Sequence, residues 1–167
     1  MKEKLYTIPL MDAFKAGDEC PFCFVERQLE QHAMDFVLGA GASYMEDDVR
    51  AETDKMGFCR THYKKMYDYG NRLGTGLILK THFQYKTKEL HEQIRIFAPS
   101  RASVFSRFKK GNTDTDAPKT SLGAWVKEQE DTCYICNFYK DTYARYLDTF
   151  FELFKKSQEF LPLFETC

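Results

Sequence analysis

Three pairs of side chains that bind metals or take part in redox chemistry recur in this sequence, and all have the same spacing. Two pairs are Cys-x-x-Cys and one is Cys-x-x-His. In chain order they are Cys20 with Cys23, Cys59 with His62, and Cys133 with Cys136. Thiolate sulfur and imidazole nitrogen are the donors that Zn²⁺ takes in structural sites, four to an ion in a tetrahedron. Two such pairs therefore supply the ligands for one ion.

The first site that we predict combines Cys20, Cys23, Cys59 and His62 around a structural Zn²⁺. Each pair lies at the predicted start of a helix, where free N–H groups and the helix dipole favour thiolate over thiol. Pro21 suits the first position of such a helix, because its missing N–H has no partner there in any case. Two helix starts that face each other would enclose the ion.

The second site is an incomplete one at Cys133 and Cys136. The offset between the two Cys-x-x-Cys pairs, 133 − 20, is 113 residues, which indicates an internal repeat. The same offset carries the Cys-x-x-His pair past Cys167, so the second unit is either truncated or has lost that pair, and we expect truncation. Its missing donors could be Cys167, a downstream Cys-x-x-His or a second chain.

Other interpretations of the cysteines stay open. They could be ordinary buried small residues. Cys20-Pro-Phe-Cys23 also looks like a glutaredoxin or thioredoxin active site, but those folds need a β-strand directly before the motif. Here Lys15 to Glu19 reads as a helix end and a turn. An iron–sulfur cluster is not favoured, because histidine is an uncommon ligand there.

Catalytic groups outside these pairs are not evident in the sequence. His32, His82 and His91 read as ordinary helical histidines, and Glu26 and Glu30 as solvated carboxylates. No Gly-rich phosphate loop or nucleophile elbow is present. A zinc ion with four protein ligands has no open position for water, so hydrolytic zinc chemistry is not expected and we do not predict an enzyme.

Hydrophobic periodicity predicts an all-α fold, a helical bundle of two long and several short helices cross-linked by the zinc site. The long helix after Gly74 carries a predicted core face with Phe83 and Ile94, and the final helix carries one with Phe150. The predicted helices cover 9–16, a segment from Cys20 that the stretch from Gly39 to Ser43 ends, 46–55 with Gly57 as its stop, and 59–69. Further helices are predicted after Gly74 as far as Pro99, from Ser121, and from Cys133.

We expect the chain to be divided into three parts. Residues 1–98 form a first zinc-binding helical unit, 99–121 a basic flexible linker, and 122–167 an incomplete second unit that packs on the first. The linker carries Arg and Lys beside Phe, which leaves a nucleic-acid-binding accessory role as an alternative function. A net charge of −1 over 167 residues argues against a broad nucleic-acid footprint.

From the composition we predict that the chain is cytoplasmic. Apolar residues make up 43% and charged residues 29%, and no apolar run reaches the length of a membrane span. The first residues lack the apolar core of a secretion signal. Cysteine pairs in a reducing compartment are more often metal ligands or redox thiols than disulfides.

The combined motifs resemble a bacterial family of uncharacterised proteins, common in Firmicutes, that is catalogued as a domain of unknown function. The resemblance covers nearly the whole chain and rests on Cys20, Pro21, Cys23, Gly57, Phe58, Cys59, His62, Cys133, Ile135 and Cys136. It implies zinc binding and no known activity; its members continue into a second Gly-Phe-Cys-x-x-His, which this chain does not reach. We therefore expect a zinc-stabilised module that binds a protein partner or self-associates, with a thiol redox or redox-sensing role as the alternative.

Overall fold

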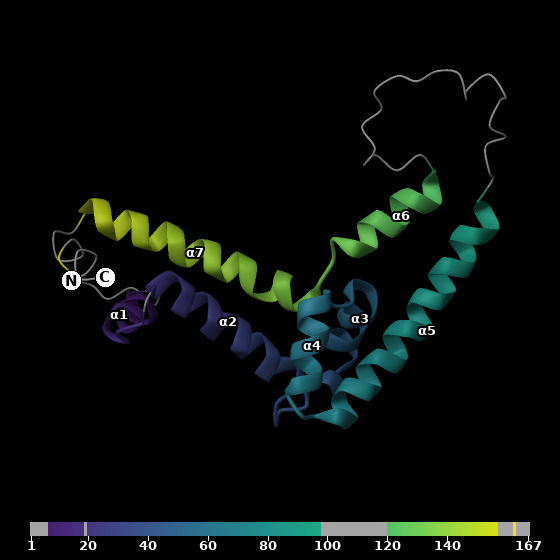
Figure 1. Cartoon of the computed structure of the whole chain (residues 1–167), viewed down its shortest axis with the longest axis horizontal. Coiled ribbons are helices and arrows are strands. Elements are labelled where there is room, and N and C mark those ends of the chain that lie inside the picture. The colour runs from purple at the N-terminus through teal and green to yellow at the C-terminus, as the bar shows by residue number, and fades with distance from the viewer. Residues whose placement is uncertain (1–6, 19, 98–119, 157–161, 163–167) are drawn as a thin grey trace, which may run out of the picture.

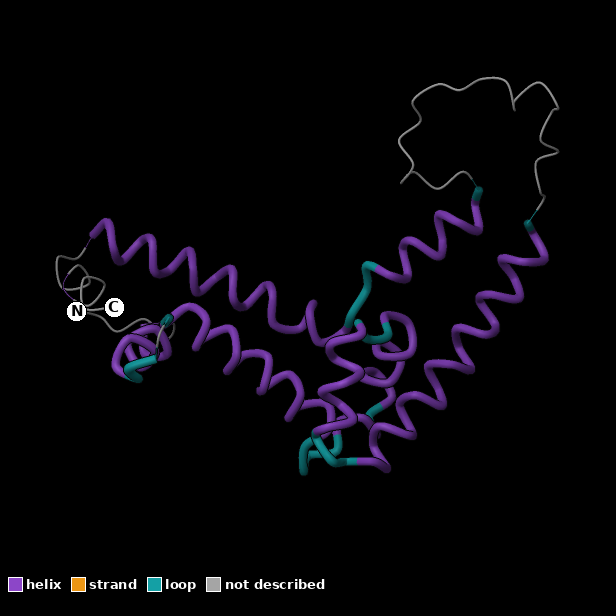
Figure 2. Tube along the Cα trace, in the orientation of Figure 1, coloured by secondary structure: helices purple, strands orange, loops and turns teal. Residues whose placement is uncertain are grey.

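The computed structural model describes residues 7–18, 20–97, 120–156 and 162, and within them the chain is helical with no strand (Figure 2). This confirms the predicted all-α class. The helices are α1 (Thr7–Lys15), α2 (Pro21–Leu38), the short 3₁₀ helix η1 (Ser43–Met45), α3 (Asp47–Met56), α4 (Arg60–Asp68), α5 (Arg72–Ile96), α6 (Ser121–Glu130) and α7 (Tyr134–Lys156).

Local sequence signals explain where two of these helices begin and end. Cys20 is the N-cap of α2 and Pro21 is its first residue, as predicted. Gly39 ends α2. Gly57 ends α3 with a φ of +63°, in the region that favours glycine, and its N–H bonds to the carbonyl oxygen of Thr53 at 2.9 Å.

The prediction was less accurate for the later helices. The side chain of Asn71 caps α5 by accepting the N–H of Gly74, so the helix starts earlier than predicted and includes that glycine. Thr120 rather than Ser121 caps α6. Within the described residues there are also three long helices, α2, α5 and α7, of 18, 25 and 23 residues, where we predicted two.

The helices form two arms that meet at α3 and α4 (Figure 1). In one arm α7 lies along α2 in the opposite direction, so the start of α7 is near the end of α2. Helix α1 packs against α2 and α7 at the far end of this arm. The other arm consists of α5, which packs on α3, and α6. The predicted linker at 99–121 lies almost wholly outside the described residues.

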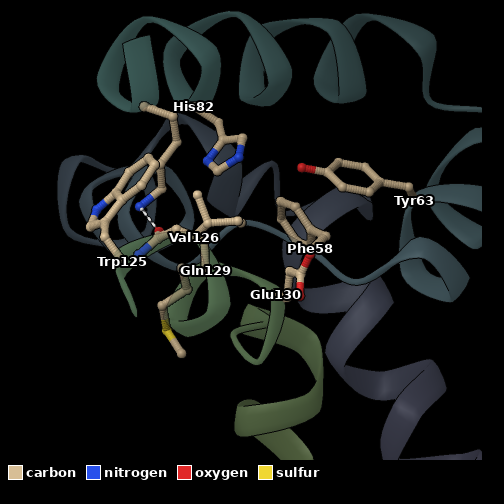
Figure 3. A pocket seen from close by; sticks show the side chains of 10 residues that line it. Phe58, Tyr63, His82, Trp125, Val126, Gln129 and Glu130 are labelled. Carbon is tan, nitrogen blue, oxygen red and sulfur yellow. Dashed lines mark hydrogen bonds between the residues drawn. The ribbon is translucent and has the colours of Figure 1, made fainter. Parts of the chain in front are cut away.

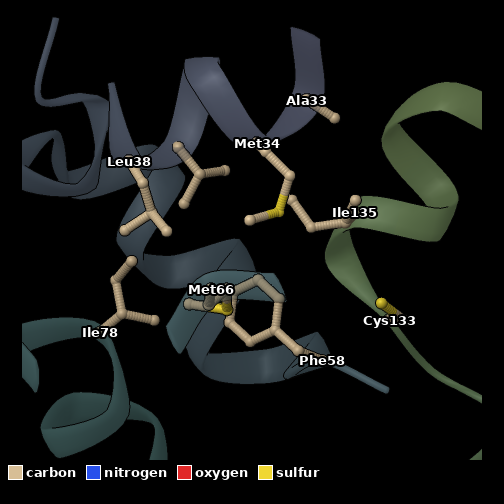
Figure 4. Close-up of a cluster of buried hydrophobic side chains, with 9 residues drawn as sticks. Ala33, Met34, Leu38, Phe58, Met66, Ile78, Cys133 and Ile135 are labelled. Atoms are coloured by element: carbon tan, nitrogen blue, oxygen red, sulfur yellow. The ribbon is translucent and has the colours of Figure 1, made fainter. Parts of the chain in front are cut away.

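Two groups of buried side chains form the core. The first lies where the arms meet and joins α2, α4, α5 and α7 (Figure 4). Its buried members are Ala33, Met34, Val37, Leu38, Phe58, Met66, Ile78, Cys133 and Ile135. The second group lies at the α1 end of the helix pair and consists of Leu10, Ala13, Val25 and Phe150. One of the zinc-ligand candidates, Cys133, is thus part of the main core.

The predicted core face of α5 is largely on the surface. Phe83 is 57% exposed and Ile94 is 52% exposed, whereas Ile78 and His82 on the same helix are buried. The reason is that α5 packs on α3 and α4 near its start and then extends beyond them (Figure 1). In the described part of the chain, no helix combines the length and the apolar character that crossing a membrane requires.

Candidate metal centre

Four donor side chains from two separate parts of the sequence meet at the junction of the arms. They are Cys59, His62, Cys133 and Cys136, and their ligand atoms all lie within 4.8 Å of one another. Nδ1 of His62 is 3.1, 3.2 and 3.5 Å from the Sγ atoms of these three cysteines in chain order. With Zn–S and Zn–N bonds of ~2.3 and ~2.0 Å, a tetrahedron requires about 3.5 Å between such atoms. The cluster is therefore close to the size that a zinc ion needs.

The turn after α3 places the Cys-x-x-His half of the cluster. Gly57 reverses the chain, the side chain of Phe58 enters the core, and Cys59 becomes the N-cap of α4. The carbonyl oxygen of Cys59 then accepts the N–H of Tyr63 at 2.9 Å. His62 follows within the first turn of the helix, so its ring and the Cys59 sulfur lie on the same side.

Hydrogen bonds between the two turns hold the Cys-x-x-Cys half against the first. The N–H of Tyr134 donates to the carbonyl oxygen of Gly57 at 2.9 Å. Beside this bond, the hydroxyl of Thr132 donates to the carbonyl oxygen of Met56 at 2.8 Å. The start of α7 is therefore fixed beside the start of α4 by the backbone, before any metal is considered.

This pairing differs from the one that we predicted. The sequence led us to combine Cys59 and His62 with Cys20 and Cys23, and the structure brings them together with the other Cys-x-x-Cys pair. His62 contacts α2 at Glu30, seven residues after Cys23. At 1.5 Å per residue this is about 10 Å along the helix axis. The four-donor cluster lies near the middle of α2, whereas Cys20 and Cys23 lie at its start.

Burial and mutual contact shift the acid–base properties of the cluster. Burial lowers the pKa of His62, which favours the neutral imidazole that a metal needs. Burial and then the neighbouring Cys133 raise the pKa of Cys136 to about 12. For Cys59, burial acts in the same direction, but the N–H of His62 and the other two thiols hold its pKa below the ordinary value. One thiol thus ionises most readily, and a dication would displace the protons of the others.

Glu30 of α2 supports the cluster from outside. Its Oε1 accepts a hydrogen bond from Nε2 of His62 at 2.8 Å, and its other oxygen pairs with Lys65. We had predicted a solvated carboxylate, but Glu30 is half-buried, with a side-chain exposure of 17%. A proton on Nε2 leaves the Nδ1 lone pair free for a metal, which is the arrangement of many carboxylate–histidine–zinc sites. Burial raises the pKa of Glu30, but the bonds from Lys65 and His62 outweigh it and keep the pKa low.

We expect Glu30→Ala to weaken zinc binding by about 10- to 100-fold, because loss of the carboxylate frees the His62 ring to rotate and to change tautomer. The measurement is the rate at which a chromogenic chelator removes zinc from the folded protein. Gln28→Ala, at an exposed position on the same helix, is the matched control and should release zinc at the wild-type rate. Equal rates for both variants and the wild type would show that Glu30 does not support the site.

The remaining predicted residues lie elsewhere. Cys20 and Cys23 lie at the start of α2 and are discussed below, and Cys167 and the basic segment 101–119 lie outside the described residues. Of the other histidines, His82 is buried and its Nδ1 donates to the carbonyl oxygen of Asp54 at 2.8 Å. This agrees with the structural role that we predicted for it.

Comparison with known proteins identifies the chain at the level of a family. The model of a family of unknown function, DUF6062, matches residues 1–167, the whole chain. The chain belongs to this family. No curated protein and no solved structure matches it. Membership in DUF6062 agrees with the resemblance to an uncharacterised family that the motifs suggested, and it assigns no activity.

A pocket of about 280 Å³ lies beside the metal cluster of this DUF6062 chain, between α5 and α6 (Figure 3). Phe58 and Tyr63 form the wall toward the cluster, and Trp125 and Val126 of α6 form the opposite wall. Lys86 also lines the pocket, and its ammonium group is hydrogen-bonded to the side chains of Gln129 and Glu89. His82 and Glu130 also line the pocket, and Nδ1 of His82 donates to the carbonyl oxygen of Asp54.

Proposed function

We propose that this chain is a zinc-stabilised helical module whose ion is structural and whose role is to bind protein. The observation that carries the proposal is the closed set of four donors, Cys59, His62, Cys133 and Cys136, at the junction of α4 and α7. Four protein ligands complete the tetrahedral shell of zinc and leave no position for a reacting water. An ion there would connect two helix starts and would not perform chemistry.

The donor types favour zinc over other common ions. Three thiolates and one imidazole are softer ligands than Ca²⁺ or Mg²⁺ prefer, since those ions take oxygen donors. The set carries a net charge of −1 once the dication is bound. The positive charge of Lys65, which pairs with Glu30 beside the site, partly offsets it. None of the five described cysteines forms a disulfide, which fits the reducing cytoplasm that we propose as the location.

Metal analysis of protein purified without a polyhistidine tag tests the zinc site. We expect about one tightly bound zinc per chain. Replacing it with Co²⁺ should give the visible absorption of tetrahedral cobalt together with a thiolate charge-transfer band, because three of the four ligands are sulfurs. Protein that contains no transition metal and takes up no Co²⁺ after reduction would contradict the proposal.

The proposed interaction surface is the apolar stripe of α5. We define the α5 stripe as Phe83, Leu90 and Ile94, which share one face of the helix and are 57%, 38% and 52% exposed. Burying a large apolar side chain stabilises a complex by about 1.5 to 3 kcal/mol, so three on one face favour contact with another surface. A second copy of the chain offers the same stripe, which makes symmetric self-association the simplest form of the proposal.

Sedimentation velocity over a range of protein concentrations tests the α5 stripe. We expect the wild-type chain to self-associate and the double variant Phe83→Lys, Ile94→Lys to remain monomeric at the same concentrations. Both positions face solvent, so the variant should keep its zinc and its melting temperature. A wild-type chain that is monomeric throughout, or a variant that associates equally well, would contradict self-association through this face.

A further inference from the structure

The first Cys-x-x-Cys pair, Cys20 and Cys23, is not used by the metal cluster described above. Cys20 is the N-cap of α2, and its Sγ accepts the backbone N–H of Cys23 at 3.4 Å. Cys20 is partly exposed and Cys23 is exposed, and neither is in a disulfide. Two reduced thiols are therefore held together at a helix start where a solute can reach them.

The surroundings of this pair repeat those of Cys133 and Cys136. In both places a short helix, α1 or α6, is followed by a Cys-x-x-Cys turn and then a long helix, α2 or α7. The carbonyl oxygen of Cys20 accepts the N–H of Phe24 at 2.9 Å, and that of Cys133 accepts the N–H of Asn137 at 3.0 Å. The two turns thus share their backbone hydrogen bonding as well as their sequence spacing.

The antiparallel packing of α2 and α7 extends this equivalence to the side chains that face each pair. Position 30 of α2 and position 143 of α7 correspond under the repeat offset of 133 − 20 = 113 residues. Glu30 reaches across to the cluster at the start of α7. Tyr143 in turn packs against the buried group at the α1 end of the helix pair, together with Phe22 and Phe24, the neighbours of Cys23. Each long helix therefore faces the cysteine pair of the other.

We propose that Cys20 and Cys23 form a second zinc half-site, equivalent to the half-site at Cys133 and Cys136. This inference rests on the proposed function, since it takes the complete cluster as the guide to the incomplete one. The two thiolates would neutralise one Zn²⁺ and supply half of its tetrahedral shell. Water would supply the other half, so this ion should bind more weakly and exchange faster than the ion in the four-donor site.

Alkylation of the reduced full-length protein with N-ethylmaleimide, read by tryptic mass spectrometry, tests the proposal with Zn²⁺ alone as the added ligand. Cleavage after Lys and Arg puts the cysteines of the three motifs in different peptides: Cys20 and Cys23 in residues 16–27, Cys59 in 56–60, and Cys133 and Cys136 in 128–140. We expect the 16–27 peptide to react quickly in protein that carries one zinc and to become protected as Zn²⁺ is added. At a free Zn²⁺ concentration about ten times the Kd, the reaction should slow about elevenfold.

The variant Cys23→Ser provides the internal check. It should abolish the Zn²⁺-dependent protection of Cys20 while the 56–60 and 128–140 peptides stay protected. Mg²⁺ in place of Zn²⁺ should protect nothing. If the 16–27 peptide reacts at the same rate with and without Zn²⁺, the half-site proposal is overturned. If instead the 56–60 and 128–140 peptides are unprotected in zinc-loaded protein, the structural site of the proposed function has failed, so the two failures are distinct.

Discussion

Cys133→Ser is expected to abolish tight zinc binding and to lower the melting temperature more than any other single cysteine substitution in the described part of the chain. Cys133 is only 3% exposed and belongs to both the metal cluster and the main core. A ligand that binds only the folded state contributes about 4 kcal/mol when its concentration is about 1,000 times its Kd. A serine hydroxyl is a poor zinc ligand, so the variant should lose about this much. Metal content and thermal unfolding, measured on the same sample, check the prediction.

Two controls separate loss of the metal from loss of packing. Cys23→Ser, at an exposed cysteine outside the cluster, should keep the first zinc and nearly the wild-type melting temperature. Wild type and Cys133→Ser should also unfold at similar temperatures once a strong chelator has removed zinc from both. A large difference that persists without metal would mean that Cys133 acts through packing, and the structural role of the ion would be contradicted.

Gly57→Ala is expected to lower the free energy of unfolding by about 3 kcal/mol, because it combines two unfavourable effects. Gly57 has φ +63° and ψ −155°, a conformation that is essentially restricted to glycine. A Cβ atom at this position would also lie 2.6 Å from Cε1 of His82, well inside van der Waals contact. Since the turn at Gly57 positions Cys59, zinc affinity should fall as well. Chemical denaturation and chelator competition measure the two effects.

Gly41→Ala is the matched control for this substitution. Gly41 is not among the glycines of positive φ, and nothing lies within 4 Å of a Cβ built on it. Alanine there should be neutral or slightly stabilising, because it reduces the freedom of the unfolded chain. The double variant Gly57→Ala, His82→Ala would relieve the steric contact and retain the backbone strain. If Gly57→Ala is as stable as Gly41→Ala, the turn at Gly57 does not need its observed conformation.

The helices of this fold could be predicted because their signals are local. Pro21 at the start of α2, Gly39 at its end and Gly57 at the end of α3 each act on neighbouring backbone groups, and all three were placed correctly. The surface position of the α5 stripe could not be predicted in this way. A periodic apolar face shows that a helix is amphipathic, but whether a neighbour covers that face depends on how far the helix extends past its partners.

Local sequence signals also could not show which Cys-x-x-Cys pair lies beside Cys59 and His62. Both Cys-x-x-Cys pairs have the right donors, and we chose the first partly because it is complete within one predicted unit. Chain separation does not decide such a choice, since each doubling of loop length adds only about 0.6 kcal/mol to the closure entropy. What decides it in the structure is the antiparallel packing of α2 and α7, with the hydrogen bond from Tyr134 to Gly57. The predicted repeat, which relates the two Cys-x-x-Cys pairs to each other, was the sequence signal for the alternative partner.

Glu30 was missed for a related reason. A glutamate on an amphipathic helix is normally solvated, and its sequence context gives no sign of a histidine that approaches from another helix. The spacing of Glu30 from Met34 and Leu38, which are buried at the i+4 and i+8 positions, does place it on the core side of α2. A carboxylate in line with a buried stripe is therefore worth testing as a partner of a predicted ligand.

The hydrogen-bonded turns at Gly57 and Tyr134 connect stretches that are far apart along the polypeptide, and an ion held between them would act as a reversible crosslink. By the entropic treatment of disulfides, closing a loop of this size restricts the unfolded chain by about 4 to 5 kcal/mol. A single cut in the backbone between residues 97 and 120 would then leave two fragments that the ion holds together. Chelation would remove this crosslink and leave the fragments held by the packing of α6 and α7 on the rest of the chain, so metal supply would tune how tightly the split protein reassembles.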